Sequence, residues 1–152
     1  MKYLIKLFCL LGFIPIFAQT FTLQELEMYA KYDFETFSRK VMSKGYEFYS
    51  SVDIITFRYT ESTVNNIYLI NYTNDGILYT TTYKSSYTNL VNSIKERKYT
   101  YITSTKEGNN QVCSHYQNDN YVISTCIASI ETEYYEKPSI SFYEVHILPI
   151  IN

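Results

Sequence analysis

Residues 111–130 have the sequence QVCSHYQNDNYVISTCIASI, in which two β-type segments flank Asp119-Asn120. Asn and Asp favour tight turns, so this dipeptide predicts a two-residue hairpin turn. The resulting register places Cys113 directly opposite Cys126, on the face opposite to the apolar one. We therefore predict a cross-strand disulfide, which is the usual state of a cysteine pair in an exported chain.

The same strand allows a second interpretation, in which Cys113 is a nucleophile and His115 is its base. Residues two positions apart lie on the same face of a strand, so the two side chains would be neighbours. However, the sequence supplies neither a turn for an oxyanion nor a third group to orient the histidine. The disulfide is therefore the favoured interpretation.

The N-terminus has the pattern of a secretory signal peptide. Lys2 and Lys6 precede an apolar run over residues 7–17, and Ala18 supplies a small residue at the cut. The run is shorter than the roughly 20 apolar residues that a membrane span needs. We expect cleavage between Ala18 and Gln19, so that residues 1–18 are the signal, and export to the periplasm or the extracellular space.

Cleavage would leave residues 19–152, a length that fits one domain with no membrane span. The whole chain has 13 Lys and Arg against 15 Asp and Glu. Loss of Lys2 and Lys6 leaves 11 basic residues and a net charge of −4. This charge argues against nucleic acid as a partner, because nucleic acid binds to basic surfaces. Cys9 leaves with the signal, so two cysteines remain.

Helical signals occur in two regions of the chain. Thr22-Leu23-Gln24-Glu25 forms a capping box, and a second helical stretch covers residues 33–44 and ends at Gly45. Helical periodicity returns over residues 87–94, and basic residues crowd positions 95–98, which suits the C-terminal end of a helix.

Segments rich in β-branched and aromatic residues predict the strands. The turn at Asp75-Gly76 predicts a hairpin that places Tyr72 opposite Tyr79. The predicted strands cover residues 54–60, 67–72 and 77–83 before the second helical region, and 99–104, 111–116, 121–130 and 139–148 after it.

The order of helices and strands indicates an internal repeat with an offset of 53 residues. After each helix, an aromatic-x-aromatic sequence follows: Tyr46-Glu47-Phe48 and Tyr99-Thr100-Tyr101. We predict an α+β fold of two tandem α-β-β-β-like units, residues 19–84 and 85–152. Their helices would pack on one face of an antiparallel sheet. The matching positions are Phe34 with Tyr87, Phe37 with Leu90, Val41 with Ile94, Tyr46 with Tyr99, and Phe48 with Tyr101.

This arrangement, carried by residues 22–48, residues 87–101 and the cysteine hairpin, resembles the β-lactamase inhibitory protein type of fold. One such unit is similar to the small outer-membrane assembly lipoproteins. The resemblance implies an exported protein whose sheet grips a loop of a target protein. It extends to the architecture and not to the target, because this chain has one cysteine pair where that family has one per unit.

The residues with chemical potential are few, and we expect no cofactor and no metal. The histidines are His115 and His146, and no ligand motif of His, Cys or Glu surrounds them. His146 shares a strand face with Phe142 and Glu144, which we interpret as a solvated sheet position. The carboxylates at positions 131, 133 and 136 lie close together, in what we interpret as a solvated acidic loop.

Burial arguments predict where a partner would bind. The helices need an apolar sheet face, and the aromatic side of the first strands supplies it, so the polar side is left uncovered. We predict a non-catalytic protein-binding or inhibitor-like module of the cell envelope or extracellular space. A small secreted hydrolase and a structural envelope protein without a discrete site are the alternatives. The expected partner-binding residues are Arg58, Asn71, Thr80, Thr82 and His115, with Arg58 as the anchor.

Overall fold

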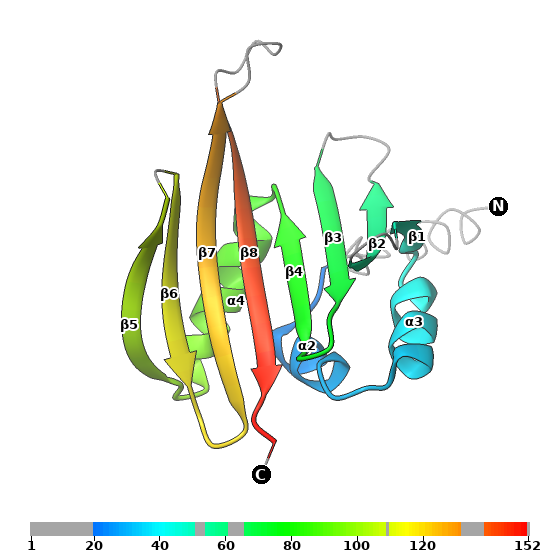
Figure 1. The fold of residues 1–152 in the computed structure, drawn as a ribbon, viewed down its shortest axis with the longest axis horizontal. Coiled ribbons are helices and arrows are strands. Elements are labelled where there is room, and N and C mark those ends of the chain that lie inside the picture. The colour runs from blue at the N-terminus through cyan, green and yellow to red at the C-terminus, as the bar shows by residue number, and fades with distance from the viewer. Residues whose placement is uncertain (1–19, 51–53, 61–65, 109, 132–138, 152) are drawn as a thin grey trace, which may run out of the picture.

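The computed structural model describes residues 20–50, 54–60, 66–108, 110–131 and 139–151. Within these ranges the protein has an α+β fold, with three helices and one open antiparallel sheet of eight strands (Figure 1). The predicted signal peptide lies outside the described residues. The elements are α2 (Leu23–Tyr29), α3 (Phe34–Ser43), β1 (Glu47–Ser50), β2 (Ile55–Thr60), β3 (Ile67–Tyr72), β4 (Ile77–Thr81), α4 (Lys84–Glu96), β5 (Thr100–Glu107), β6 (Gln111–Gln117), β7 (Tyr121–Glu131) and β8 (Ser139–Pro149).

The sheet joins two four-stranded meanders. Its order is β1-β2-β3-β4-β8-β7-β6-β5, so β8 is inserted between β4 and β7 (Figure 1). The two edge strands, β1 and β5, are the strands that directly follow α3 and α4. None of the helices in the described part of the chain is long and apolar enough to cross a membrane.

Local sequence explains where the helices begin. Thr22 caps α2 in a capping box with Glu25, as predicted, and the Asp33 side chain accepts a hydrogen bond from the Thr36 N–H at the start of α3. Each cap satisfies backbone N–H groups that have no partner within the helix. The predicted stretch over residues 33–44 is thereby confirmed as a capped helix.

The α3 and α4 helices end in the same way. After α3, Gly45 adopts φ +86° and the Tyr46 N–H donates to the Val41 carbonyl. After α4, Lys98 adopts φ +60° and the Tyr99 N–H donates to the Ile94 carbonyl. Both ends are Schellman motifs, in which a residue in the left-handed region reverses the chain.

The core lies between one face of the sheet and the helices. In Figure 1, α2 and α4 lie behind the sheet, and Phe37 of α3 packs edge-to-face on Phe57 of β2. Aromatic rings dominate this core, since Tyr46 and Tyr79 are among its largest fully buried side chains. Its sheet residues alternate along the strands and include Phe57, Tyr68, Ile70, Ile77, Tyr79, Tyr121, Ile123, Val145 and Ile147.

The strand count differs from the prediction in the first unit, because four strands follow α3 where three were predicted; the four strands predicted after the second helical region are present after α4. The prediction missed β1, which has only four residues and lies at the edge of the sheet, where Phe48 and Tyr49 remain exposed. An exposed edge segment lacks the alternation by which a half-buried strand is recognised.

The predicted register of the β3–β4 hairpin is also wrong. Tyr72 pairs with Ile77, and Tyr79 pairs with Ile70. The turn begins at Thr73, whose side chain accepts a hydrogen bond from the Gly76 N–H. At Gly76 a Cβ atom would overlap the Ile147 carbonyl oxygen, so glycine is needed for close approach to β8.

Candidate binding face

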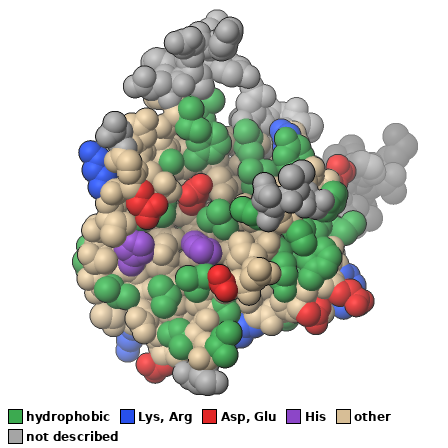
Figure 2. Space-filling view, in the orientation of Figure 1, with side chains coloured by type: hydrophobic (Ala, Val, Ile, Leu, Met, Phe, Trp, Pro, Cys, Tyr) green, Lys and Arg blue, Asp and Glu red, His purple; other side chains and the backbone are tan. Residues whose placement is uncertain are grey.

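The sheet face opposite to the core carries two rows of side chains that cross seven strands, from β2 to β5. We call this surface the open face. Figure 2 shows it from the front, with two histidines near its middle and acidic side chains beside them. One row contains Thr56, Asn71, Leu78, His146, Ser124, His115 and Thr103, and the other contains Arg58, Leu69, Thr80, Glu144, Cys126, Cys113 and Thr105.

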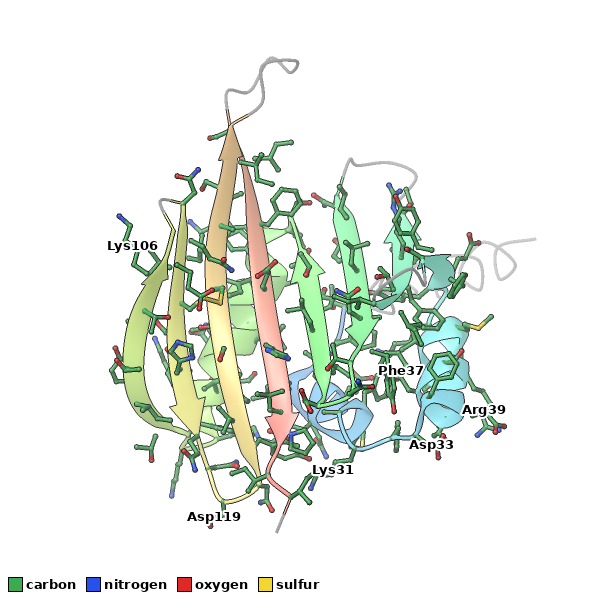
Figure 3. The ribbon with its side chains drawn as sticks, viewed as in Figure 1. Lys31, Asp33, Phe37, Arg39, Lys106 and Asp119 are labelled. Atoms are coloured by element: carbon green, nitrogen blue, oxygen red, sulfur yellow. A yellow bond between two sulfur atoms is a disulfide. The ribbon has the colours of Figure 1, made fainter. Side chains whose placement is uncertain are left out.

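The disulfide lies on the open face as predicted. Cys113 pairs directly with Cys126, and their sulfur atoms are bonded between β6 and β7 (Figure 3). The interpretation of Cys113 as a free nucleophile is therefore wrong. Both cysteines are buried, and the Gln111 side chain reaches across β7 to donate a hydrogen bond to Glu144 at 3.0 Å.

His115 lies between two hydroxyl groups on neighbouring strands. Its Nδ1 is 2.8 Å from Ser124 Oγ, and its Nε2 is 2.9 Å from Thr105 Oγ1. A serine hydrogen-bonded to a histidine has the geometry of a nucleophile and its base. Here a hydroxyl, and not a carboxylate, occupies the position of the group that would orient the ring.

The site also contains His146 and Glu144, which sequence analysis interpreted as solvated. Both side chains are half-buried in the centre of the sheet. Burial lowers the pKa of His146, and the negative charge of Asp75 partly opposes this shift. Burial raises the pKa of Glu144, the Gln111 hydrogen bond partly opposes this effect, and repulsion from Glu107 adds to it.

Three polar atoms of the open face are buried and have no hydrogen-bond partner among the described residues. They are Arg58 Nε, Asn71 Oδ1 and His146 Nε2. The Arg58 guanidinium lies 5.3 Å from the centre of the exposed Tyr49 ring. Buried polar groups without partners are uncommon in folded proteins and cost free energy.

The two predicted threonines have different surroundings. Thr80 lies on the open face between Leu69 and Glu144, but only 6% of its surface is exposed. Thr82 lies just beyond β4, where its hydroxyl accepts a hydrogen bond from the Ile67 N–H. Its side chain therefore closes the end of the β3–β4 ladder. Of the predicted partner-binding residues, Arg58, Asn71, Thr80 and His115 share the open face.

The strand order is the reason that sequence analysis did not bring Glu144 and His146 together with His115. Insertion of β8 beside β7 places Glu144 opposite Cys126 and His146 opposite Ser124. A usable signal was present, because the predicted strands over residues 121–130 and 139–148 have equal lengths and are close enough in sequence to form a hairpin.

No group of three or more His, Cys, Asp or Glu side chains within the described ranges is arranged to hold a metal ion. The carboxylates at positions 133 and 136 lie outside those ranges. Comparison with protein-family models finds no matching family, and comparisons with curated proteins and with solved structures find no significant match.

Proposed function

We propose that this protein is an exported, non-catalytic protein-binding module whose partner docks on the open face. The main support for the proposal is the width of the open face, which crosses seven strands. The helices pack against the opposite face of the sheet and fill the core there. A broad sheet face offers little enclosure to a small molecule but fits a protein surface or loop.

The unsatisfied polar atoms of the open face support this placement. Arg58 Nε, Asn71 Oδ1 and His146 Nε2 reduce the stability of the free protein, because each has lost water without gaining a hydrogen bond. Such costs concentrate at functional sites, where a sequence is selected for something other than stability.

The proposal includes a duplicated architecture, residues 19–84 and 85–152, of the kind found in β-lactamase inhibitory proteins. The sheet order supports this duplication. The four strands after α3 run from one edge of the sheet to its centre in chain order, and the four strands after α4 do the same from the other edge. The Schellman ends at Gly45 and Lys98 are separated by the same 53 positions that align the two segments in sequence. A buried tyrosine follows each of these two residues: Tyr46 follows Gly45, and Tyr99 follows Lys98.

Export is part of the proposal, and the disulfide supports it. Cysteine pairs persist as disulfides in oxidising compartments and are rare in the cytosol. The partner would accordingly be another protein of the cell envelope or the extracellular space, and no cofactor is required.

A matched pair of arginine substitutions tests the binding face. Leu69→Arg places a bulky charge in the centre of the open face, whereas Met28→Arg places it on the exposed surface of α2. Mature protein immobilised on resin is used to capture binders from envelope and culture fractions. We expect a partner retained by the wild type and by Met28→Arg but lost with Leu69→Arg. Equal retention by both variants would remove the open face as the site.

The contact between Ser124 and His115 favours one second candidate, a hydrolase. The test is hydrolysis of p-nitrophenyl acetate by the wild type and by Ser124→Ala. The binding proposal expects both proteins to match the rate of free imidazole at the same concentration. A wild-type rate well above that level, abolished in Ser124→Ala, would favour the enzyme.

A further inference from the structure

The carboxylate at the centre of the open face has no cationic partner among the residues that the structure describes. Glu144 lies on β8, with Thr80 of β4 on one side and Cys126 of β7 on the other. Within the described residues, the ion pairs are Lys44 with Glu25 and Arg97 with Glu27. The neutral amide of Gln111 donates a hydrogen bond to the Glu144 carboxylate.

The surroundings of Glu144 make its negative charge unfavourable. Repulsion from Glu107 adds to the effect of burial, so both disfavour the charged form of Glu144. His146, two positions along the same strand, favours its neutral form because it is partly buried. A half-buried carboxylate without a counter-ion is destabilising, and an incoming cation would offset this cost.

Two basic residues of the described sheet, Arg58 and Lys106, lie away from Glu144. Arg58 is in the same row as Glu144 but three strands away, a distance of about 14 Å at the usual strand spacing. Its guanidinium is already over the Tyr49 ring. Lys106 lies at the outer edge of the sheet on β5 (Figure 3), in register with Val112 and therefore with the helix side.

Apolar side chains lie near the carboxylate. Leu78 lies on the neighbouring strand β4, Phe142 lies two positions away on β8, and Leu69 lies one strand further away, on β3. A charged group in the middle of apolar neighbours is typical of binding hot spots, because the neighbours exclude water once a partner is seated. This environment strengthens an ion pair that forms across the interface.

We infer that the partner presents a lysine or arginine side chain that pairs with Glu144 at the centre of the open face. This inference rests on the proposed function and specifies the chemistry of the partner. The cation would pair with Glu144, with the Gln111 amide holding the Glu144 carboxylate in place. Glu144, and not Arg58, is then the anchor of the interface.

The test uses a library of disulfide-cyclised peptides displayed on phage and selected on the oxidised mature protein. Enriched peptides are synthesised, and their dissociation constants are measured against wild type, Leu69→Arg, Glu144→Gln and Glu96→Gln. Glu96 is an exposed carboxylate on α4, so Glu96→Gln removes the same charge far from the open face. Circular dichroism and thermal melting establish that each variant is folded.

We expect the enriched peptides to share a Lys or Arg whose replacement by norleucine weakens binding about tenfold or more. Glu144→Gln should cause a similar loss, which added salt reduces, while Glu96→Gln changes affinity less than about twofold. Peptides that need Leu69 but lack a basic residue, or bind Glu144→Gln as tightly as wild type, would overturn the inference and leave the binding face intact. Peptides unaffected by Leu69→Arg would overturn both.

Discussion

A single buried carboxylate links three elements on the helix side of the sheet. Glu27 of α2 is 4% exposed, and its two oxygens accept from Arg97 at 2.7 Å and from the Tyr99 hydroxyl at 2.6 Å. Its backbone carbonyl accepts a hydrogen bond from the Tyr121 hydroxyl at 3.0 Å. Unlike Glu144, this carboxylate is fully partnered, so it contributes to stability.

We predict that Glu27→Ala destabilises the protein by about 3 kcal/mol, because it leaves Arg97 and the buried Tyr99 hydroxyl without their partner. Urea denaturation monitored by circular dichroism measures this change in the free energy of unfolding. The control is Lys44→Ala, which breaks a more exposed ion pair with Glu25 and should cost less than about 1 kcal/mol. Equal losses in the two variants would contradict the role given to Glu27.

Glu144 should have the opposite effect on stability. Its folded pKa lies above its ordinary value of 4.5, so its contribution to stability is present at low pH and is lost as pH rises through the folded pKa. Glutamine stays neutral throughout. We predict that Glu144→Gln is more stable than wild type at pH 7, and that the difference shrinks as pH falls through the folded pKa and becomes constant below about 4.5.

Thermal melts of both proteins from pH 3 to pH 8 provide the measurement. His146 affects the pH dependence of stability in the opposite direction, and does so in both proteins. Its folded pKa lies below 6.5, so its contribution to stability is lost as pH falls through the folded pKa. The difference between the two profiles therefore isolates Glu144. A pH-independent difference would show that the carboxylate is not destabilised in the folded protein.

The matching ends of α3 and α4 lead to a prediction for these elements. Lys98, after α4, has the left-handed backbone conformation that Gly45 has after α3. Side chains make this conformation unfavourable, and glycine relieves the clash. We predict that Lys98→Gly stabilises the protein by about 0.5–1 kcal/mol, measured by urea denaturation, and that Gly45→Ala destabilises it by a similar amount. Destabilisation by Lys98→Gly would indicate that its side chain has a role of its own.

The β-hairpins show which part of the fold can be predicted from sequence. For β6 and β7, the turn residues, the alternation and the cysteine pair all specify one register, and the predicted pairings of Cys113 with Cys126 and His115 with Ser124 are confirmed. For β3 and β4 the turn sequence was the main guide. Thr73 pairs with Gly76, so the turn lies at Asn74-Asp75, one position earlier than predicted, and the register differs from the prediction by two residues.

The candidate site was predictable to the extent that it depends on alternation within a strand. Arg58 and Asn71 were placed on the polar face because their neighbours in sequence are apolar, and His115 was placed there by the register of its hairpin. The centre of the site depends on the insertion of β8 between β4 and β7, which is a long-range pairing. Local propensity carries little information on such pairings, so Glu144 and His146 were assigned to solvent.

The chain as a whole should carry no free thiol after export. We predict that intact mass of the exported protein corresponds to residues 19–152 with one disulfide, and that thiol titration in denaturant gives no signal. The bond closes a short loop, with a sequence separation of 13, so reduction should lower the free energy of unfolding by about 3 kcal/mol. Two titratable thiols in the unreduced protein would contradict this prediction.

The central position of β8 has a consequence for how the molecule folds. Ile77 pairs with Ile147, 70 positions later, so the last strand along the chain joins the two halves of the sheet. Closing so long a loop has a large entropic cost, and proteins rich in such distant pairings fold slowly. Before β8 is added, β4 and β7 each have a neighbouring strand on one side only. A chain made from its N-terminus therefore cannot complete this sheet until β8 has emerged, a delay that would suit the proposed export, because export channels thread unfolded chains.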